Sequence, residues 1–269
     1  MAVMSPVVVV SGRPAWSGRI AAVLDAHGFA LKHYDEQAGY VSRLTDDGAA
    51  LILVDGGRDD WRYWATTPKT SPATRRIPIL LVARDPAIRQ EARSVGADMA
   101  LTPEALVAEM PRLLADHARV PDAAASRRLR EQCQEPLPAK ALEAIAQFNA
   151  GEYYKQHDLL EALWMAEDGP VRDLYRAILQ VGIAYYQITR GNRQGALKML
   201  LRSVQWLAVL PDVCRGVDVS QLREDAARVR EALEGAADLS AFDRGLLRPV
   251  RLVEPPEQGR AGPKSTPGR

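Results

Sequence analysis

The chain has 269 residues, of which 47% are hydrophobic and 26% are charged, and its formal net charge is +1. This composition is typical of a globular protein and excludes a disordered or fibrous one. A nearly neutral chain gives no electrostatic reason to expect nucleic acid or an acidic lipid surface as the main partner. A chain of this length accommodates one large domain or two ordinary ones.

The N-terminal segment and the cysteines favour a cytoplasmic protein. Residues 1–12, MAVMSPVVVVSG, have no positively charged start and only a short apolar run, unlike a signal peptide. No apolar stretch approaches the roughly 20 residues that cross a bilayer. Cys133 and Cys214 are far apart and form no CxxC pair, so neither a disulfide framework nor a zinc site follows from them.

Residues 1–115 alternate short apolar runs with amphipathic stretches. The runs VVVVSG, ALILVDGG and IPILLVARD have the length and β-branched content of strands buried on both faces of a parallel sheet. The stretches between them place apolar residues at helical spacing and end at glycines such as Gly28 and Gly96. The repetition of strand, helix and glycine turn predicts an α/β doubly wound fold.

The character of the chain changes after residue 115. Residues 116–137 are charged and have prolines near both ends, which predicts a linker with at most a short helix in solvent. Residues 138–235 show five amphipathic segments with short connections and no strand pattern, which predicts an antiparallel helical bundle. Residues 236–269 end in a stretch rich in Pro, Gly and charge, and we expect this C-terminal extension to be largely disordered.

Several residues of the predicted bundle mark helix ends and faces. Asn192 stands where an N-cap is expected, and Asp218 opens an Asp-x-x-Gln capping box. Gly191 is placed to end the preceding helix. In the first segment of the bundle, Leu142, Ile145 and Phe148 share one face and are expected in the core.

Four segments of the N-terminal half stand in a distinctive order. They are VVVVSGRPAWSGRIAAVLDAHGF, ALILVDGG, KTSPATRRIPILLVARD and VGADMALTP. In order and spacing they resemble the receiver domains of response regulators, from about Val7 to Leu114. The resemblance implies a flavodoxin-like sheet of five parallel strands, with any site at the carboxyl ends of the strands. It also implies phosphorelay signal transduction, in which an aspartate beside a bound Mg²⁺ is phosphorylated.

The chain departs from the receiver pattern at most positions that carry this chemistry. The acidic pair that holds Mg²⁺ through oxygen ligands is replaced by Ser11-Gly12. The phosphoacceptor aspartate is retained as Asp55. The position of the Thr or Ser hydroxyl falls on Val82 or Ala83, and the lysine that precedes a proline is Thr102. A carboxylate without the metal that neutralises phosphoryl charge is a poor acceptor. We therefore expect a pseudo-receiver that docks or dimerises; phosphorylation of Asp55 and a small-ligand site at the strand ends are the alternatives.

Two predicted helices of the C-terminal half place polar and aromatic residues on facing sides. Successive residues of a helix are rotated by about 100° around its axis, so the polar and aromatic positions listed below fall on one face of each helix. If the two helices pack antiparallel, these faces meet in a buried polar network, which costs several kcal/mol unless every group is paired. The positions are Tyr153, His157, Glu161, Trp164, Asp173, Arg176 and Gln180.

The segments that carry these residues form a second recognisable pattern. FNAGEYYKQHDLLEALW, ILQVGIAYYQITRGNRQGALKMLLRSVQWL and VDVSQLREDA resemble the DUF309 family, an all-helical domain of unknown function, from about Pro138 to Leu233. The resemblance implies that His157, Glu161 and Trp164 are signature positions of the family. It implies no reaction.

His157 and Glu161 allow three interpretations. As metal ligands they are only two, whereas zinc takes three or four ligands and the other histidines lie outside the bundle. As an acid/base pair, Glu161 orients His157 toward a small ligand, with Arg176 as a third catalytic candidate. As a structural network, the pair and Trp164 fix the register of the helices, which is the interpretation we favour.

The whole pattern predicts a regulatory or scaffolding protein in which a pseudo-receiver is joined to a helical domain of unknown activity. The receiver-like domain is expected to contact a protein partner, a homodimer is open, and neither membrane nor nucleic acid is expected. No cofactor is predicted, although a divalent metal at His157 and Glu161 stays open. The alternative is a metal-dependent or acid/base enzyme, or a small-ligand binder, that uses His157, Glu161 and Arg176.

Overall fold

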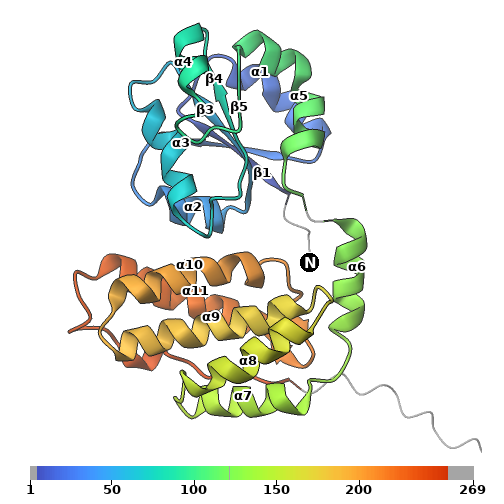
Figure 1. The fold of residues 1–269 in the computed structure, drawn as a ribbon, viewed down its shortest axis with the longest axis vertical. Coiled ribbons are helices and arrows are strands. Elements are labelled where there is room, and N and C mark those ends of the chain that lie inside the picture. Colours follow the sequence, from blue (N-terminus) through green and yellow to red (C-terminus); the bar gives the residue numbers. More distant parts are fainter. Residues whose placement is uncertain (1–4, 121, 254–269) are drawn as a thin grey trace, which may run out of the picture. The chain divides into compact units, whose positions relative to one another are not determined.

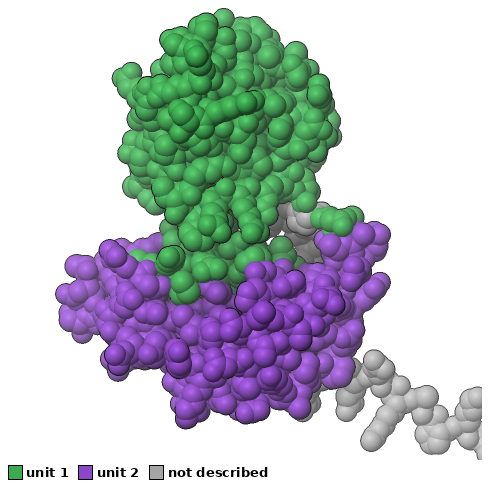
Figure 2. All heavy atoms as spheres, viewed as in Figure 1, with its two compact units in different colours: residues 1–123, 197–209 green, residues 124–196, 210–269 purple. Residues whose placement is uncertain are grey.

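The computed structural model describes residues 5–120 and 122–253. Contacts within the chain divide it into two compact units, which Figure 2 colours separately. The first comprises residues 1–123 with 197–209, and the second comprises residues 124–196 with 210–269. Within the described ranges, no helix combines the length and the apolar character that crossing a bilayer requires.

The first unit contains a parallel sheet with the strand order β2-β1-β3-β4-β5 (Figure 1). This is the flavodoxin-like order, in which the site of the fold lies at the carboxyl ends of the strands near β1 and β3. The predicted α/β class is therefore confirmed. The strands are β1 (Val7–Ser11), β2 (Ala30–Tyr34), β3 (Ala49–Asp55), β4 (Ile79–Val82) and β5 (Met99–Leu101).

Helices cover both faces of this sheet, because successive strand residues point to opposite sides. Val8 and Val10 of β1 pack in the cluster that includes α1 and α5, and Val7 and Val9 pack in the cluster that includes α2 and α3. All four valines are buried, as the continuous apolar run predicts. The helices are α1 (Ser17–Ala26), α2 (Tyr40–Asp46), α3 (Trp61–Thr70), α4 (Pro86–Glu91) and α5 (Pro103–His117).

The five helices predicted for residues 138–235 are present, and a sixth precedes them. Asn192 caps the fourth by accepting a hydrogen bond from the Gly195 backbone N–H (2.9 Å), and Asp218 caps the fifth in the same way (3.0 Å). Gly191 ends its helix with a φ of 75°. The helices are α6 (Ala123–Gln132), α7 (Ala139–Asn149), α8 (Lys155–Ala166), α9 (Arg172–Thr189), α10 (Arg193–Leu207) and α11 (Val219–Gly235).

Two expectations about the C-terminal half are corrected. A two-stranded antiparallel hairpin, β6 (Val213–Cys214) and β7 (Val217–Asp218), interrupts the helices, and strands this short leave no periodic pattern in a sequence. Leu142 is 45% exposed, whereas Ala141, Ile145 and Phe148 are buried. The core stripe of α7 includes alanine, so Leu142 lies one residue off the stripe instead of on it.

Both segments expected outside the folded domains are partly folded. Ten residues of the predicted linker form α6, whose residues group with the second unit from residue 124 onward. In the C-terminal extension, Val250 is buried, and both its backbone N–H and its carbonyl bond to the Asn149 side chain (2.7 and 2.9 Å). The short helix η1 (Arg244–Leu246) precedes it. The predicted disorder of residues 254–269 lies outside the described residues.

The two cysteines are joined. Cys133, just after α6, and Cys214, in β6, form a disulfide that closes a separation of 81 residues. Both are buried, with 4% and 0% exposure. No spacing pattern predicts this pair, because the proximity of the two cysteines depends on how α6 and the hairpin fold together.

Candidate functional site

The carboxyl ends of β1 and β3 lie side by side in the first unit, and they carry the positions that receiver chemistry uses. Ser11 is 1% exposed, and its hydroxyl accepts a hydrogen bond from the Asp55 backbone N–H (2.9 Å). The Asp55 carboxylate accepts one from the Gly57 backbone N–H (3.0 Å). Ser11 therefore positions the aspartate's backbone and offers no carboxylate to a metal.

A guanidinium group occupies the space beside Gly12. The Nη1 atom of Arg58 lies 2.6 Å from the position that a Cβ on Gly12 would take, so any side chain there would force Arg58 to move. Gly12 also has a φ of 74°, a backbone conformation that favours glycine. The Mg²⁺ that the receiver resemblance implies does not fit these residues, because a fixed cation and a glycine stand where acidic ligands are needed.

Asp60 holds Arg58 in place. Its carboxylate accepts hydrogen bonds from Arg58 Nε (2.8 Å) and Nη2 (3.1 Å), from Trp64 Nε1 (2.9 Å) and from Gln37 Nε2 (2.9 Å). The hydrogen bonds from Arg58 hold the pKa of Asp60 well below its usual range. The same bonds, with the nearby charge of Asp55 as a smaller cause, raise the pKa of Arg58. The cation beside Asp55 is thus permanent.

The residues at the remaining receiver positions have structural roles. Thr102 is the N-cap of α5, and its hydroxyl accepts a hydrogen bond from the Ala105 backbone N–H (3.2 Å). Ala83 packs so closely on Gly56 that a Cβ on that glycine would lie 2.7 Å from the Cβ of Ala83. Neither residue offers the lysine or the hydroxyl that would contact a phosphoryl group on Asp55.

The second candidate site lies along the contact between α8 and α9. Residues near the start of α8 contact residues near the end of α9, and residues near the end of α8 contact residues near the start of α9. The two helices therefore run antiparallel, as predicted. This register places Glu161 opposite residues 177–179. The pairs are Tyr153 with Tyr185, Tyr154 with Tyr186, Gln156 with Gly182, and Trp164 with Arg176.

The structure brings together one part of the predicted polar network. The guanidinium of Arg176 lies over the ring of Trp164, 4.4 Å from its centre, and its Nη1 is 3.5 Å from Asp173 Oδ1. Burial raises the pKa of Asp173, with Arg176 opposing the shift. Gln180 has its side-chain oxygen buried, and this atom has no hydrogen-bond partner within the described chain.

The other part of the network does not form. His157 Nδ1 lies 3.1 Å from the carboxylate of its neighbour Asp158, and its ring stacks on Tyr154. Glu161 makes no ion pair or hydrogen bond with any described residue. The His157 side chain is 30% exposed, so this face of α8 is half-buried and not the buried network that we expected. Tyr153 instead packs edge-on against Phe148.

No group of three or more histidine, cysteine or acidic side chains in residues 5–120 and 122–253 is placed to hold a metal ion. His157 and Glu161 therefore gain no further protein ligand from the described chain. Zinc sites in proteins use three or four.

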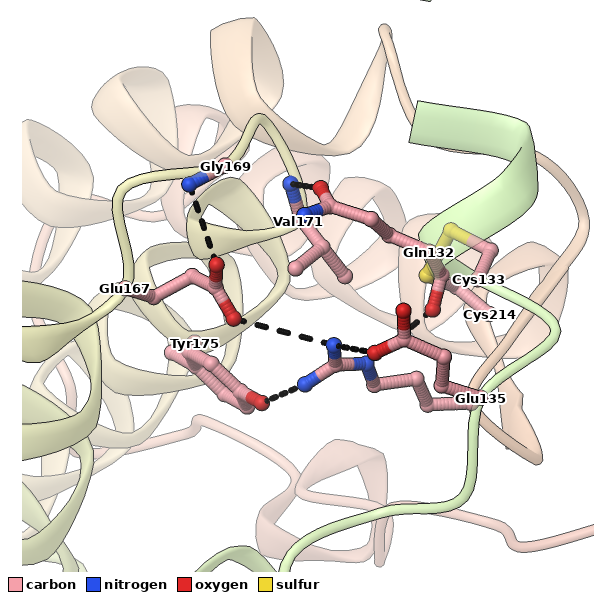
Figure 3. A network of polar contacts seen from close by, with 9 residues as sticks. Gln132, Cys133, Glu135, Glu167, Gly169, Val171, Tyr175 and Cys214 are labelled. Carbon is pink, nitrogen blue, oxygen red and sulfur yellow. Dashed lines mark hydrogen bonds and ion pairs between the residues drawn. A yellow bond between two sulfur atoms is a disulfide. The ribbon is translucent and has the colours of Figure 1, made fainter. Parts of the chain in front are cut away.

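One polar cluster was missed by the sequence reasoning. Arg215 is 7% exposed, and its guanidinium donates to the Tyr175 hydroxyl, the Glu135 carboxylate and the Gln132 carbonyl, and lies 3.6 Å from Glu167. Figure 3 shows these partners beside the disulfide: Gln132 ends α6, Tyr175 lies on α9, and Glu135 and Glu167 follow the ends of α6 and α8. The one available signal was the Arg-Gly pair between two short apolar segments, VCRGVD, which is typical of a tight hairpin turn.

Comparison with known proteins finds similarity in the C-terminal half of the chain. Residues 141–199 match the DUF309 family, a domain of unknown function. An uncharacterised protein of Aquifex aeolicus (strain VF5) is 27% identical over 82 residues, which are 30% of this chain and 25% of that protein. The chain thus spans about a quarter of the length of this relative.

Solved receiver structures align with the N-terminal part. A protein described as a response regulator of Chloroflexus aurantiacus J-10-fl has a TM-score of 0.34 and 17% identity, covering 41% of this chain and 98% of that one. The signal receiver domain of a histidine kinase from Syntrophus aciditrophicus has a TM-score of 0.33 and 22% identity, covering 44% and 96%. The assignment of the fold rests on the strand order described above.

Proposed function

We propose that this is a regulatory or scaffolding protein whose receiver-like unit acts without phosphorylation and is joined to a helical domain of unknown activity. The observation that carries the proposal is Arg58, whose guanidinium lies against Gly12 and is fixed by Asp60 beside Asp55. Receiver chemistry requires a metal ion at this place to neutralise the charge of the incoming phosphoryl group.

An arginine cannot replace that metal in the phosphorylation reaction. A divalent ion binds the phosphoryl oxygens directly and brings two charges, whereas the guanidinium of Arg58 already uses two of its N–H groups on Asp60. Asp55 in turn accepts a hydrogen bond from Gly57. The cluster is thus satisfied as it stands, which supports a fixed receiver-like unit over one that switches on phosphorylation.

The partners of such a unit follow as proposals. A receiver fold that has lost its chemistry retains a folded surface, and we propose that it contacts a protein partner or a second copy of the chain. The cytoplasmic location expected from the sequence is likewise proposed.

The proposal is tested with the full-length protein, acetyl phosphate and Mg²⁺, followed by intact mass spectrometry. We expect no added phosphoryl group. The matched positive control is the triple variant Ser11→Asp, Gly12→Asp, Arg58→Ala, which restores the acidic pair and clears the space for a metal ion. The negative control adds Asp55→Asn to that variant. A phosphoryl group on Asp55 of the wild-type chain would contradict the proposal.

A second function, small-ligand binding by the helical domain, is supported by a different observation. Buried polar atoms near the contact of α8 and α9, such as Gln180 Oε1 and Trp164 Nε1, have no hydrogen-bond partner among residues 5–120 and 122–253. Native proteins contain few such atoms, and each calls for an explanation.

A further inference from the structure

Two buried hydrogen-bond donors near the start of α9 have no acceptor among the residues that the structure describes. Trp164 Nε1 and Arg172 Nε are both removed from solvent, and neither has a hydrogen-bond partner in the described part of the chain. Leaving a buried donor unpaired costs about 1–3 kcal/mol. Two such losses close together indicate that an acceptor is bound here in the working protein.

The two donors belong to one cluster. The guanidinium carbon of Arg172 lies 5.9 Å from the centre of the Trp164 ring, and that of Arg176 lies 4.4 Å from the same centre. Arg176 has Asp173 as a counterion at 3.5 Å. Arg172 makes no ion pair with a described residue. The Asp173 carboxylate thus pairs closely with Arg176 and acts on Arg172 only through a weaker, longer-range attraction.

The chemistry of the donors limits what they can bind. An indole N–H and a guanidinium are donors only, so the missing partner must be an acceptor. A guanidinium pairs best with a carboxylate or phosphate, whose oxygens match its planar set of N–H groups. An indole N–H directed at the same oxyanion adds one more hydrogen bond.

The loop that joins the two donors is held by contacts on its other side. The Val171 backbone N–H donates to the Gln132 side chain (3.2 Å), and that of Gly169 donates to Glu167 (3.0 Å) (Figure 3). Glu167 is in turn 3.6 Å from Arg215. Loop residues fixed in this way limit the motion of Arg172 and reduce the entropy that a ligand would lose on binding.

We propose that Trp164 and Arg172 form a binding site for a small oxyanion, a carboxylate or phosphate group, at the α8–α9 end of the helical domain. The site is separate from Asp55 and does not depend on how the receiver-like unit works. The carboxylates of Glu161 and Asp173 share this side of the helices, and they oppose the binding of an anion. The affinity is therefore carried by the hydrogen bonds from the two donors and not by net charge.

The test uses ¹⁵N-labelled full-length protein at constant ionic strength. Sodium phosphate and sodium acetate are titrated separately, with sodium chloride as the reference, and the Trp164 indole N–H resonance is assigned with Trp164→Phe. We expect a saturable shift with at least one oxyanion. A shift with phosphate alone identifies a phosphate-type ligand, and a shift with acetate alone identifies a carboxylate. A shift with both identifies an oxyanion site without selectivity. Each of these outcomes supports the proposal. No saturable shift, or an equal shift with chloride, overturns it.

Calorimetric titration of variants with the oxyanion that binds identifies the residues. Arg172→Gln is expected to weaken binding about tenfold or more, because a charge-assisted hydrogen bond contributes about 1.5–3 kcal/mol. Arg190→Gln, at an exposed position directly after the end of the same helix, is the matched control and should leave binding unchanged. Glu161→Gln should bind equally or more tightly. Unchanged binding in a folded Arg172→Gln protein, or loss in Glu161→Gln, overturns the assignment.

Discussion

At the scale of single residues, the strand ends of the α/β unit are organised by Asp60. It accepts hydrogen bonds from a fixed cation, from a buried indole and from an amide. The indole belongs to Trp64, which is 0% exposed and packs on Tyr40 with ring centres 4.6 Å apart. The Asp60 carboxylate therefore holds Arg58 against Gly12 and also accepts a hydrogen bond from the buried indole N–H of Trp64.

Replacing Asp60 should destabilise this unit. In Asp60→Ala the buried Trp64 N–H loses its acceptor, so we expect the free energy of unfolding to fall by about 1–3 kcal/mol. Urea denaturation followed by tryptophan fluorescence measures the change. The neighbouring Asp59 is exposed, and Asp59→Ala should stay within about 0.5 kcal/mol. Equal effects of the two variants would show that Asp60 has no special role.

The same residue should give the unit a dependence on acid. Because hydrogen bonds lower the pKa of Asp60 from its ordinary 3.8 in the folded state, the unfolded chain binds more protons as the pH falls. The contribution of Asp60 to the free energy of unfolding is complete at pH values above 3.8 and is lost as the pH falls below it. The stability difference between wild type and Asp60→Ala should therefore shrink below about pH 4.

The residue scale also shows where sequence reasoning stops. It could be predicted that the acidic pair is replaced by Ser11-Gly12 and that Asp55 is retained, because each of these residues directly follows or ends a predicted strand. The role of Arg58 could not, because it depends on a side chain folding back over a strand end that is distant in sequence. The predicted His157–Glu161 contact failed because helical spacing fixes a shared face but not the rotamers, and His157 bonds its neighbour Asp158 instead.

At the scale of elements, the hairpin β6–β7 joins α6 to the helical unit. Arg215 takes a φ of 50°, which is unusual for a residue with a Cβ. Its side chain reaches partners on α6 and α9 and Glu167, just after α8. The adjacent disulfide makes the same connection covalently. The predicted linker is in this way fixed at its C-terminal end.

Removing the Arg215 side chain should destabilise this connection. In Arg215→Ala the carbonyl, carboxylate and hydroxyl groups around it lose a shared donor. Because the Glu135 and Glu167 side chains are 56% and 23% exposed, water replaces part of what they lose, and we expect a cost of about 1–3 kcal/mol. Hydrogen exchange of the α6 amides should accelerate, and the unfolding free energy of the helical unit should fall. Arg251, 64% exposed and 3.7 Å from Asp218, provides the control: Arg251→Ala should change stability by less than about 1 kcal/mol. If α6 exchange is unchanged in Arg215→Ala, the cluster does not hold the helix.

At the scale of the whole molecule, the class of each half was predictable and the connections between elements were not. Long apolar runs and repeated helical faces carry strong periodic signals, which the strand order and the helices of residues 138–235 confirm. The disulfide, the hairpin and the folding of residues 236–253 all depend on contacts between segments distant in sequence. Short segments of this kind give no periodicity from which their partners could be inferred.

The central claim, that a fixed guanidinium stands where a receiver domain binds its metal ion, can be measured directly. Mg²⁺ is titrated into ¹⁵N-labelled full-length protein at constant ionic strength, and the amide of Gly57 and the side-chain N–H of Arg58 are followed by NMR. The account predicts no saturable shift of either resonance at millimolar Mg²⁺. A saturable shift that disappears in Asp55→Asn would contradict it, because it would place a metal ion at this carboxylate.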